Sequence, residues 1–271
     1  MAFKPFGTRT LMAAVLVFAL LLAGVGSKDR MTRRARESAR RAQCVNNLKQ
    51  IGQAIADYQV VLHSYPIGTV PNGSIPLHRR LGWGVLVYDF DTEHRSGYVG
   101  MDFDLPWDDP RVESSSRLGS GSMLHCPSGP KWTPASPTLP ASYVGIAGLG
   151  PDAPGLPVTD RRAGIFGDDR RVTPADVKDG LSNTMMVADT AQGRAPWYAG
   201  GRATVRGVDP ALRPQVGPGR PFGGVHGDGA NVLMADGSVR WVRPTPTSAG
   251  FEAMSTIAGG EVVSDPDDSS W

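Results

Sequence analysis

The chain has 271 residues, 40% of them hydrophobic and 20% charged, so it can form a sizeable core and is not largely disordered. The formal net charge is only +2, and the basic residues gather in residues 28–41. This local patch, without a nucleic-acid-binding motif around it, argues against a nucleic-acid partner. The 34 Gly and 23 Pro residues favour short strands and many turns over a helical bundle.

The chain begins with an apolar stretch. Residues 10–27 carry no charge, and as a helix they would span roughly 27 Å, close to the ~30 Å hydrocarbon core of a bilayer. We therefore expect residues 1–27 to form an N-terminal segment with a membrane anchor at residues 11–27. A cleaved signal peptide is the alternative, because small residues follow the apolar run.

Residues 28–63 have the pattern of an amphipathic helix. Their apolar residues recur at steps of three and four, which places them on one helical face: Cys44, Leu48, Ile51, Ile55, Tyr58 and Leu62. No proline occurs between Pro5 and Pro66, so one helix can run from the apolar segment through this stretch. We expect the apolar face to pack on a sheet.

Residues 64–271 predict a globular, β-rich domain, with short strands at residues 84–90 and 183–188. The clearest element is a hairpin over residues 230–242, and a short helix is expected at residues 248–257. The fold class is thus α+β, with a long N-terminal helix packed on a mainly antiparallel sheet that has Gly/Pro-rich loops.

The turn of the predicted hairpin is Asp236-Gly237, which suits a two-residue type I′ connection. That register pairs Met234 with Val239 and places Val232 on the same, core-facing side. Leu233 would then lie on the opposite side of the hairpin.

The two cysteines, Cys44 and Cys126, have no CxxC spacing, and a zinc site would need two further ligands. In an oxidising compartment they can form a disulfide. The alternative is two separate buried thiols that act as small hydrophobic residues.

His226 and Asp236-Gly237 form a motif with nine residues between the histidine and the aspartate. One interpretation makes His226 and Asp228 a metal or ligand contact. The favoured one makes His226 a hydrogen-bonded residue that fixes its loop and Asp236-Gly237 simply the turn. The chain also lacks the common sequence motifs of hydrolases and nucleotide-binding enzymes. We therefore predict no enzyme activity, no catalytic residues, no metal and no cofactor.

Several segments together resemble a bacterial family. They are residues 40–52 (RRAQCVNNLKQIG), 124–127 (LHCP), 179–184 (DGLSNT) and 226–237 (HGDGANVLMADG). They resemble prepilin-type proteins with a processing-associated His-x9-Asp-Gly domain of unknown function, whose signature would be His226, Asp236 and Gly237. The residues after Gly7 differ from the prepilin cleavage pattern, which leaves cleavage of the N-terminus open.

The resemblance implies a membrane-anchored, pseudopilin-like protein. It would be a single-pass protein of the bacterial inner membrane, attached through residues 11–27, with its globular domain outside the cytoplasm. Its role would be structural or in assembly, in the cell envelope or in a type II secretion or type IV pilus-like system, with other pseudopilin-like subunits as partners. The alternative is an exported solute- or ion-binding module.

Overall fold

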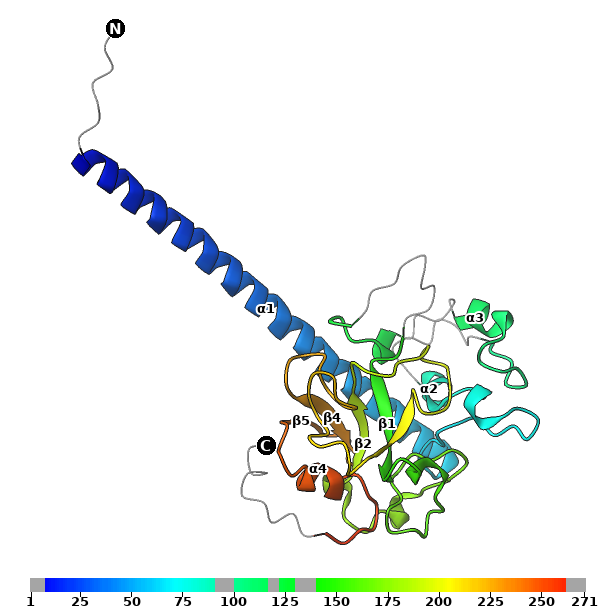
Figure 1. Cartoon of the computed structure of the whole chain (residues 1–271). Coiled ribbons are helices and arrows are strands. Elements are labelled where there is room, and N and C mark those ends of the chain that lie inside the picture. Colours follow the sequence, from blue (N-terminus) through cyan, green and yellow to red (C-terminus); the bar gives the residue numbers. More distant parts are fainter. Residues whose placement is uncertain (1–7, 91–99, 117–121, 130–139, 262–271) are drawn as a thin grey trace.

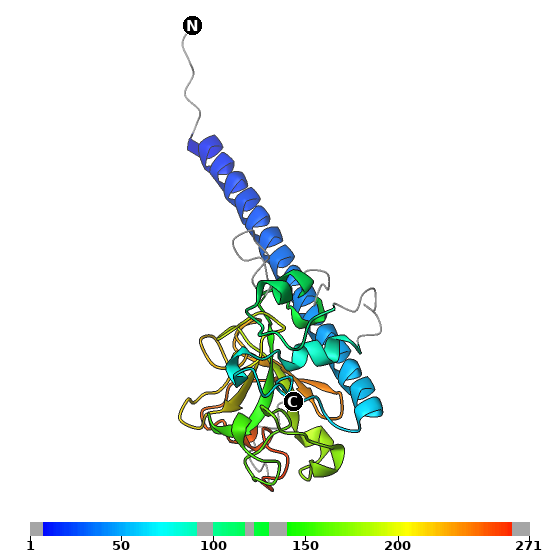
Figure 2. The ribbon, with the colours of Figure 1, turned by 90° about the vertical axis from the view of Figure 1, so that its right-hand side faces the viewer.

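A long helix and a five-stranded sheet make up the fold (Figure 1). The computed structural model describes residues 8–90, 100–116, 122–129 and 140–261, without the side chains of residues 8–11 and 13–30. Helix α1 (Thr8–Leu62) lies with its C-terminal part against the sheet, and its N-terminal part projects well beyond the globular domain in both views (Figures 1 and 2).

The sheet has the strand order β3-β1-β2-β4-β5. The pairs β1–β2, β2–β4 and β4–β5 are antiparallel, whereas β1 and β3 are parallel. The sheet is therefore mainly antiparallel, as predicted, but mixed at one edge. The strands are β1 (Tyr143–Leu149), β2 (Met185–Asp189), β3 (Val205–Val208), β4 (Ala230–Met234) and β5 (Val239–Val242).

Short helices lie in the long connections of the domain. The α-helices are α2 (Trp83–Tyr88), α3 (Pro110–Ser116) and α4 (Ala249–Ala253). The 3-10 turns are η1 (Leu77–Arg79), η2 (Ser122–Leu124), η3 (Ala153–Gly155), η4 (Pro174–Asp176) and η5 (Leu181–Asn183). The predicted helix at residues 248–257 is thus present in shorter form as α4, and Phe251 and Met254 are buried.

The apolar face of α1 is buried in the domain. Leu48, Ile51, Ile55 and Tyr58 are each no more than 5% exposed, which confirms the face predicted from the three–four spacing. Leu62 is 42% exposed because it is the last residue of the helix, beyond this covered stretch. Farther upstream the guanidinium carbon of Arg41 lies 3.6 Å from the centre of the Trp241 ring of β5.

Both faces of the sheet are covered. On the face toward α1, Tyr143, Val187 and Leu233 pack with the helix in one hydrophobic cluster. On the other face, Val232 and Met234 pack with α4 residues in a second cluster. Strands buried on both sides lose the alternation of apolar and polar residues, and β2 and β4 are buried at every position.

The β4–β5 hairpin is present, but its register differs from the predicted one by one residue. Leu233 pairs with Val239, and the Met234 amide donates to the Ser238 carbonyl, so the loop has three residues. Only Gly237 in this loop has a positive φ, of 83°, whereas a type I′ turn needs two such residues. The prediction failed because Asp236 stays at negative φ and caps the turn, accepting a 2.9 Å hydrogen bond from the Ser238 amide.

The one-residue difference puts Val239 on the face of Leu233, not on the face of Val232 and Met234, which are buried together in the second cluster. Leu233 lies toward α1, where a Cβ atom added at Gly52 would be 3.0 Å from its Cδ1. Gly52 therefore lets the helix approach the strand closely.

The predicted strand at residues 84–90 is wrong, because this segment forms α2. Its run of apolar residues has no clear period of two, and such a run fits a buried helix as well as a strand. Trp83, Val85 and Val87 are all buried in the cluster beside α1, so packing on several sides selects the helix. The predicted strand at residues 183–188 agrees with β2.

The prediction of a membrane-spanning helix is contradicted. No helix in the part of the chain that the structure describes is long and apolar enough to cross a bilayer. The transmembrane anchor and the single-pass inner-membrane location are corrected accordingly. The physical reason is that four exposed arginines, Arg33, Arg34, Arg36 and Arg40, follow within the described side chains of α1. The side chains of residues 11–27, apart from Met12, lie outside the described ones.

Candidate functional site

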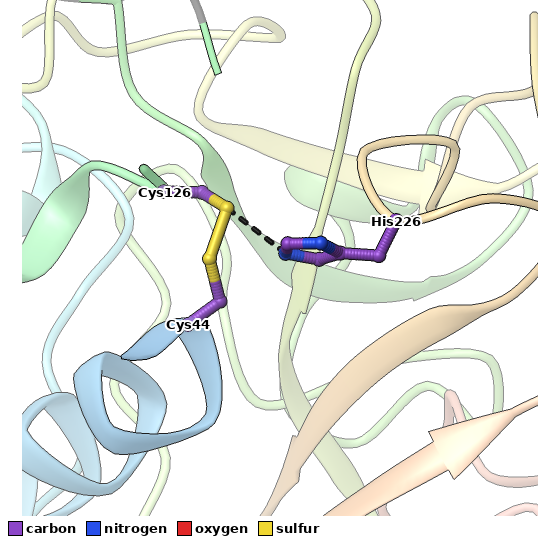
Figure 3. A group of neighbouring side chains, drawn as sticks. All are labelled: Cys44, Cys126 and His226. Atoms are coloured by element: carbon purple, nitrogen blue, oxygen red, sulfur yellow. Dashed lines mark hydrogen bonds between the residues drawn. A yellow bond between two sulfur atoms is a disulfide. The ribbon is translucent and has the colours of Figure 1, made fainter. Parts of the chain in front are cut away.

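The disulfide between Cys44 and Cys126 is the centre of the candidate site (Figure 3). Cys44 is on α1 and Cys126 follows η2, and their sulfur atoms are 2.08 Å apart. Both residues are buried. The bond therefore joins the helix to the globular domain at the point where α1 enters the core. Of the two alternatives left open by the sequence, a disulfide or two separate thiols, the structure has the disulfide.

Hydrogen bonds hold the two segments in place beside the disulfide. Asn47, one turn after Cys44, donates from its amide nitrogen to the carbonyl of His125 at 2.6 Å. The Tyr143 hydroxyl of β1 donates to the carbonyl of Cys44 at 3.3 Å. These bonds use backbone carbonyls on both sides of the disulfide, so its position is fixed by the helix, the η2 segment and the sheet together.

His226 lies in the loop before β4 and points its ring at the disulfide (Figure 3). Its Nε2 is 3.0 Å from Sγ of Cys126, and its Nδ1 is 2.8 Å from Oε1 of Glu37. The residue as a whole is partly exposed through its backbone, but its side chain has 0% exposure. The ring, which carries the chemistry of the residue, is therefore fully buried.

Glu37 completes the arrangement from the helix. Its carboxylate accepts hydrogen bonds from His226, from Arg40 at 2.7 Å and from the Ser128 hydroxyl at 3.2 Å. Partial burial acts to raise the pKa of Glu37, but these hydrogen bonds outweigh it and hold that pKa below its ordinary value. The group is therefore an anion at neutral pH.

The proton positions in this group follow from its chemistry. An ionised carboxylate only accepts hydrogen bonds, so Nδ1 of His226 carries a proton toward Glu37. A disulfide sulfur has no proton to give, so Nε2 either donates weakly to Cys126 or faces it with its lone pair. In this state the imidazole links two distant parts of the chain and positions the loop before β4.

The other residues of the predicted motif do not join this cluster. Asp228 is exposed, and Asp236 and Gly237 form the hairpin turn at the far end of β4. Gly229 has a packing role, because a Cβ atom there would lie 2.3 Å from the Trp241 ring. Gly229, the last residue of this loop, is thus fitted closely under β5, whereas Gly227 and Asp228 are exposed.

The contribution of Glu37 to this site was not predicted from the sequence. It stands in the basic segment, where it counted only as a charge, and it is 189 residues from His226. One local signal exists, since Glu37 precedes Cys44 by seven residues and therefore lies two turns away on the same face of α1.

A buried carboxylate near this loop was also missed. Asp189, at the end of β2, accepts hydrogen bonds from the Asn231 amide at 3.0 Å and from its side chain at 2.8 Å. Burial raises the pKa of Asp189 to about 7, although the bonds from Asn231 oppose that rise. Its other carboxylate oxygen has no partner within the described residues.

Comparison with known proteins identifies a family without assigning an activity. Searches of curated proteins and of solved structures give no match. A family described as "Protein of unknown function (DUF1559)" matches residues 33–211, about two thirds of the chain. That description mentions no pseudopilin role, no secretion role and no His-x9-Asp-Gly motif. The match covers α1 from Arg33 on, η2 and three of the five strands, and the chain belongs to this family of proteins of unknown function.

Proposed function

We propose that this protein is a non-enzymatic structural or assembly subunit, similar in kind to a pseudopilin, whose helix α1 makes the contact with other subunits. The observation that carries the proposal is the length of α1 compared with the part of it that the domain covers. The helix has 55 residues, which corresponds to roughly 80 Å at 1.5 Å per residue. Among the residues of α1 whose side chains the structure describes, the first buried one is Cys44.

A helix that projects from its domain is short of stabilising contacts. Helices in proteins derive most of their stability from packing rather than from intrinsic propensity. All residues from Met31 to Arg36 are exposed, and Met31 itself is 72% exposed. Packing against a second subunit would bury this surface and stabilise the projecting helix, as it does in assemblies built from long helices.

The exposed part of α1 is strongly basic, which indicates the chemistry of its partner surface. Arg33, Arg34 and Arg36 are exposed within four residues, and Arg40 follows one turn later. Only Glu37 offsets them in this segment, and it is engaged by Arg40 and His226. We expect the contacting surface of the partner to be acidic, and the association to weaken as salt screens it.

The state of the candidate site supports the non-enzymatic part of the proposal. The sulfur atoms of Cys44 and Cys126 are bonded to each other, and the ring of His226 is buried. Neither a thiolate nor an imidazole is offered to a substrate in this state. A solute-binding pocket at His226 has less support, because the imidazole faces Cys126 and Glu37.

Sedimentation velocity of the full chain tests the proposal. We expect concentration-dependent self-association, weakened by added salt and by the double charge reversal Arg33→Glu/Arg36→Glu. Arg243→Glu, an exposed arginine on the globular domain just after β5, is the matched control and should associate like the wild type. A monomer at all concentrations, or equal association of all three proteins, would refute a role for α1 in assembly.

A further inference from the structure

Three potential metal ligands from distant parts of the chain converge at the candidate site. Sγ of Cys44, Sγ of Cys126 and Nε2 of His226 all lie within 4.8 Å of one another (Figure 3). With the disulfide closed, the sulfurs bind each other. We propose that, once the disulfide is reduced, Cys44, Cys126 and His226 bind a thiophilic divalent cation, with Zn²⁺ as the best fit.

The geometry needs only small changes to hold zinc. Tetrahedral zinc with bonds of about 2.3 Å to sulfur and about 2.0–2.1 Å to nitrogen places two sulfurs roughly 3.8 Å apart and sulfur and nitrogen roughly 3.5 Å apart. The Cys126 sulfur and His226 Nε2 are already 3.0 Å apart. The Cα atoms of the two cysteines are 5.3 Å apart, so side-chain rotation can separate the sulfurs.

Glu37 prepares His226 for this role. Histidine ligands of zinc usually donate their other ring N–H to a carboxylate, which fixes the tautomer and the ring orientation. Glu37 accepts that bond from Nδ1 at 2.8 Å. In the neutral ring, with its proton on Nδ1, the lone pair of Nε2 is directed to the sulfur side. Three protein ligands leave a fourth position for water or a further ligand.

Metal binding requires a reductant that first opens the disulfide. A dithiol closes to its own disulfide and passes two electrons and two protons to the two cysteines; a phosphine is oxidised to the phosphine oxide with oxygen from water, and that water supplies the two protons. Binding of Zn²⁺ then releases those two protons, one from each cysteine. The double charge of the cation offsets the two thiolates, which would otherwise be poorly solvated beside the core residues around Cys44.

The two states would hold the fold by alternative cross-links. The disulfide ties α1 to the segment after η2, and the metal would tie both to the loop before β4. The domain would consequently keep α1 docked after reduction when zinc is present. This inference concerns the interior site and stands independently of the assembly role of α1.

Metal titration of the full chain, reduced with a phosphine under anaerobic conditions, tests the inference. Co²⁺ serves as the spectroscopic probe and Zn²⁺ is measured by competition with a chelating dye. We expect one equivalent of Co²⁺ with tetrahedral, thiolate-ligated absorption bands, displaced by Zn²⁺. Glu37→Gln should weaken Zn²⁺ binding about 10- to 100-fold, as loss of a partner beyond the direct ligands commonly does.

The controls separate this site from adventitious binding. His226→Ala should lose the tetrahedral spectrum, and His78→Ala, at an exposed histidine, should keep it. The oxidised protein should bind no thiolate-ligated metal. If reduction unfolds the chain, recovery of its circular dichroism on addition of Zn²⁺ supports the inference. Absence of stoichiometric binding, failure of Zn²⁺ to restore the fold, or a spectrum unchanged in His226→Ala would overturn it.

Discussion

Removal of the disulfide by the double substitution Cys44→Ala/Cys126→Ala should strongly destabilise the domain. The bond closes a loop across a sequence separation of 82 residues. The chain-entropy relation gives about 4.5 kcal/mol at 25 °C for such a loop, and native disulfides commonly contribute 2–4 kcal/mol. We therefore expect the free energy of unfolding to fall by roughly 2–4.5 kcal/mol. Urea denaturation, followed by tryptophan fluorescence and by circular dichroism, measures this change.

Two comparisons separate the cross-link from packing. The reduced wild type, kept free of metal by a chelator, should lose nearly as much stability as the double variant. Adding reductant to the double variant should change nothing. A loss below about 1 kcal/mol would refute the reasoning, because it would mean that α1 stays docked without a covalent tie.

Three further predictions concern single side chains. His226→Ala should lower the free energy of unfolding by about 1–3 kcal/mol through lost hydrogen bonds, whereas Asp228→Ala, at an exposed position of the same loop, should leave it nearly unchanged in the same urea assay. Ile51→Asp should unfold the domain by placing an unpaired charge in the core, whereas Ala56→Asp, on the exposed side of α1, should fold. Circular dichroism melting curves measure both variants, and equal curves would show that α1 is not packed. The pKa of Asp189 rises from 3.8 to about 7 on folding. Its contribution to stability is therefore full below pH 3.8 and is lost as the pH rises toward 7. At about 1.36 kcal/mol per pKa unit, the loss is at most about 4 kcal/mol. Asp189→Asn should abolish this part of the pH dependence between about pH 4 and 7, and parallel stability curves for the two proteins would exclude the effect.

The packing of α1 was predictable from the sequence because it depends on one local repeat. Leu48, Ile51 and Ile55 recur at helical spacing, and the structure buries each of them. The upstream limit of the covered face was not predictable, since the contact of Arg41 with Trp241 joins residues about 200 positions apart. The apolar run at the N-terminus predicted a membrane anchor, which the helix in the described part of the chain contradicts.

The hairpin was predictable from Asp236-Gly237, but its register was not. Register is set by a difference between the two faces, and β4 is buried on both. Val232 and Leu233 are equally apolar, so the sequence offered no sign of which one faces α1. The choice depends on a three-residue loop in which only Gly237 adopts a positive φ.

The candidate site was only partly visible in the sequence. His226 stood out through its motif, and the two cysteines could pair only with each other. Their meeting with Glu37 depends on the packing of three segments, because the contact between His226 and Glu37 spans 189 residues. No spacing rule connects residues so far apart. The structural role predicted for His226 remains a prediction until its substitution is measured.

The most direct test of the central claim, that α1 is the assembly surface, is site-specific photo-crosslinking of the full chain in its native cells. A photoreactive residue at Ala39, exposed on α1, should give a discrete adduct with a second subunit. The same residue at Arg243, exposed on the globular domain, should give none or much less. Equal adducts at both positions, or none at Ala39, would contradict an assembly role for the helix.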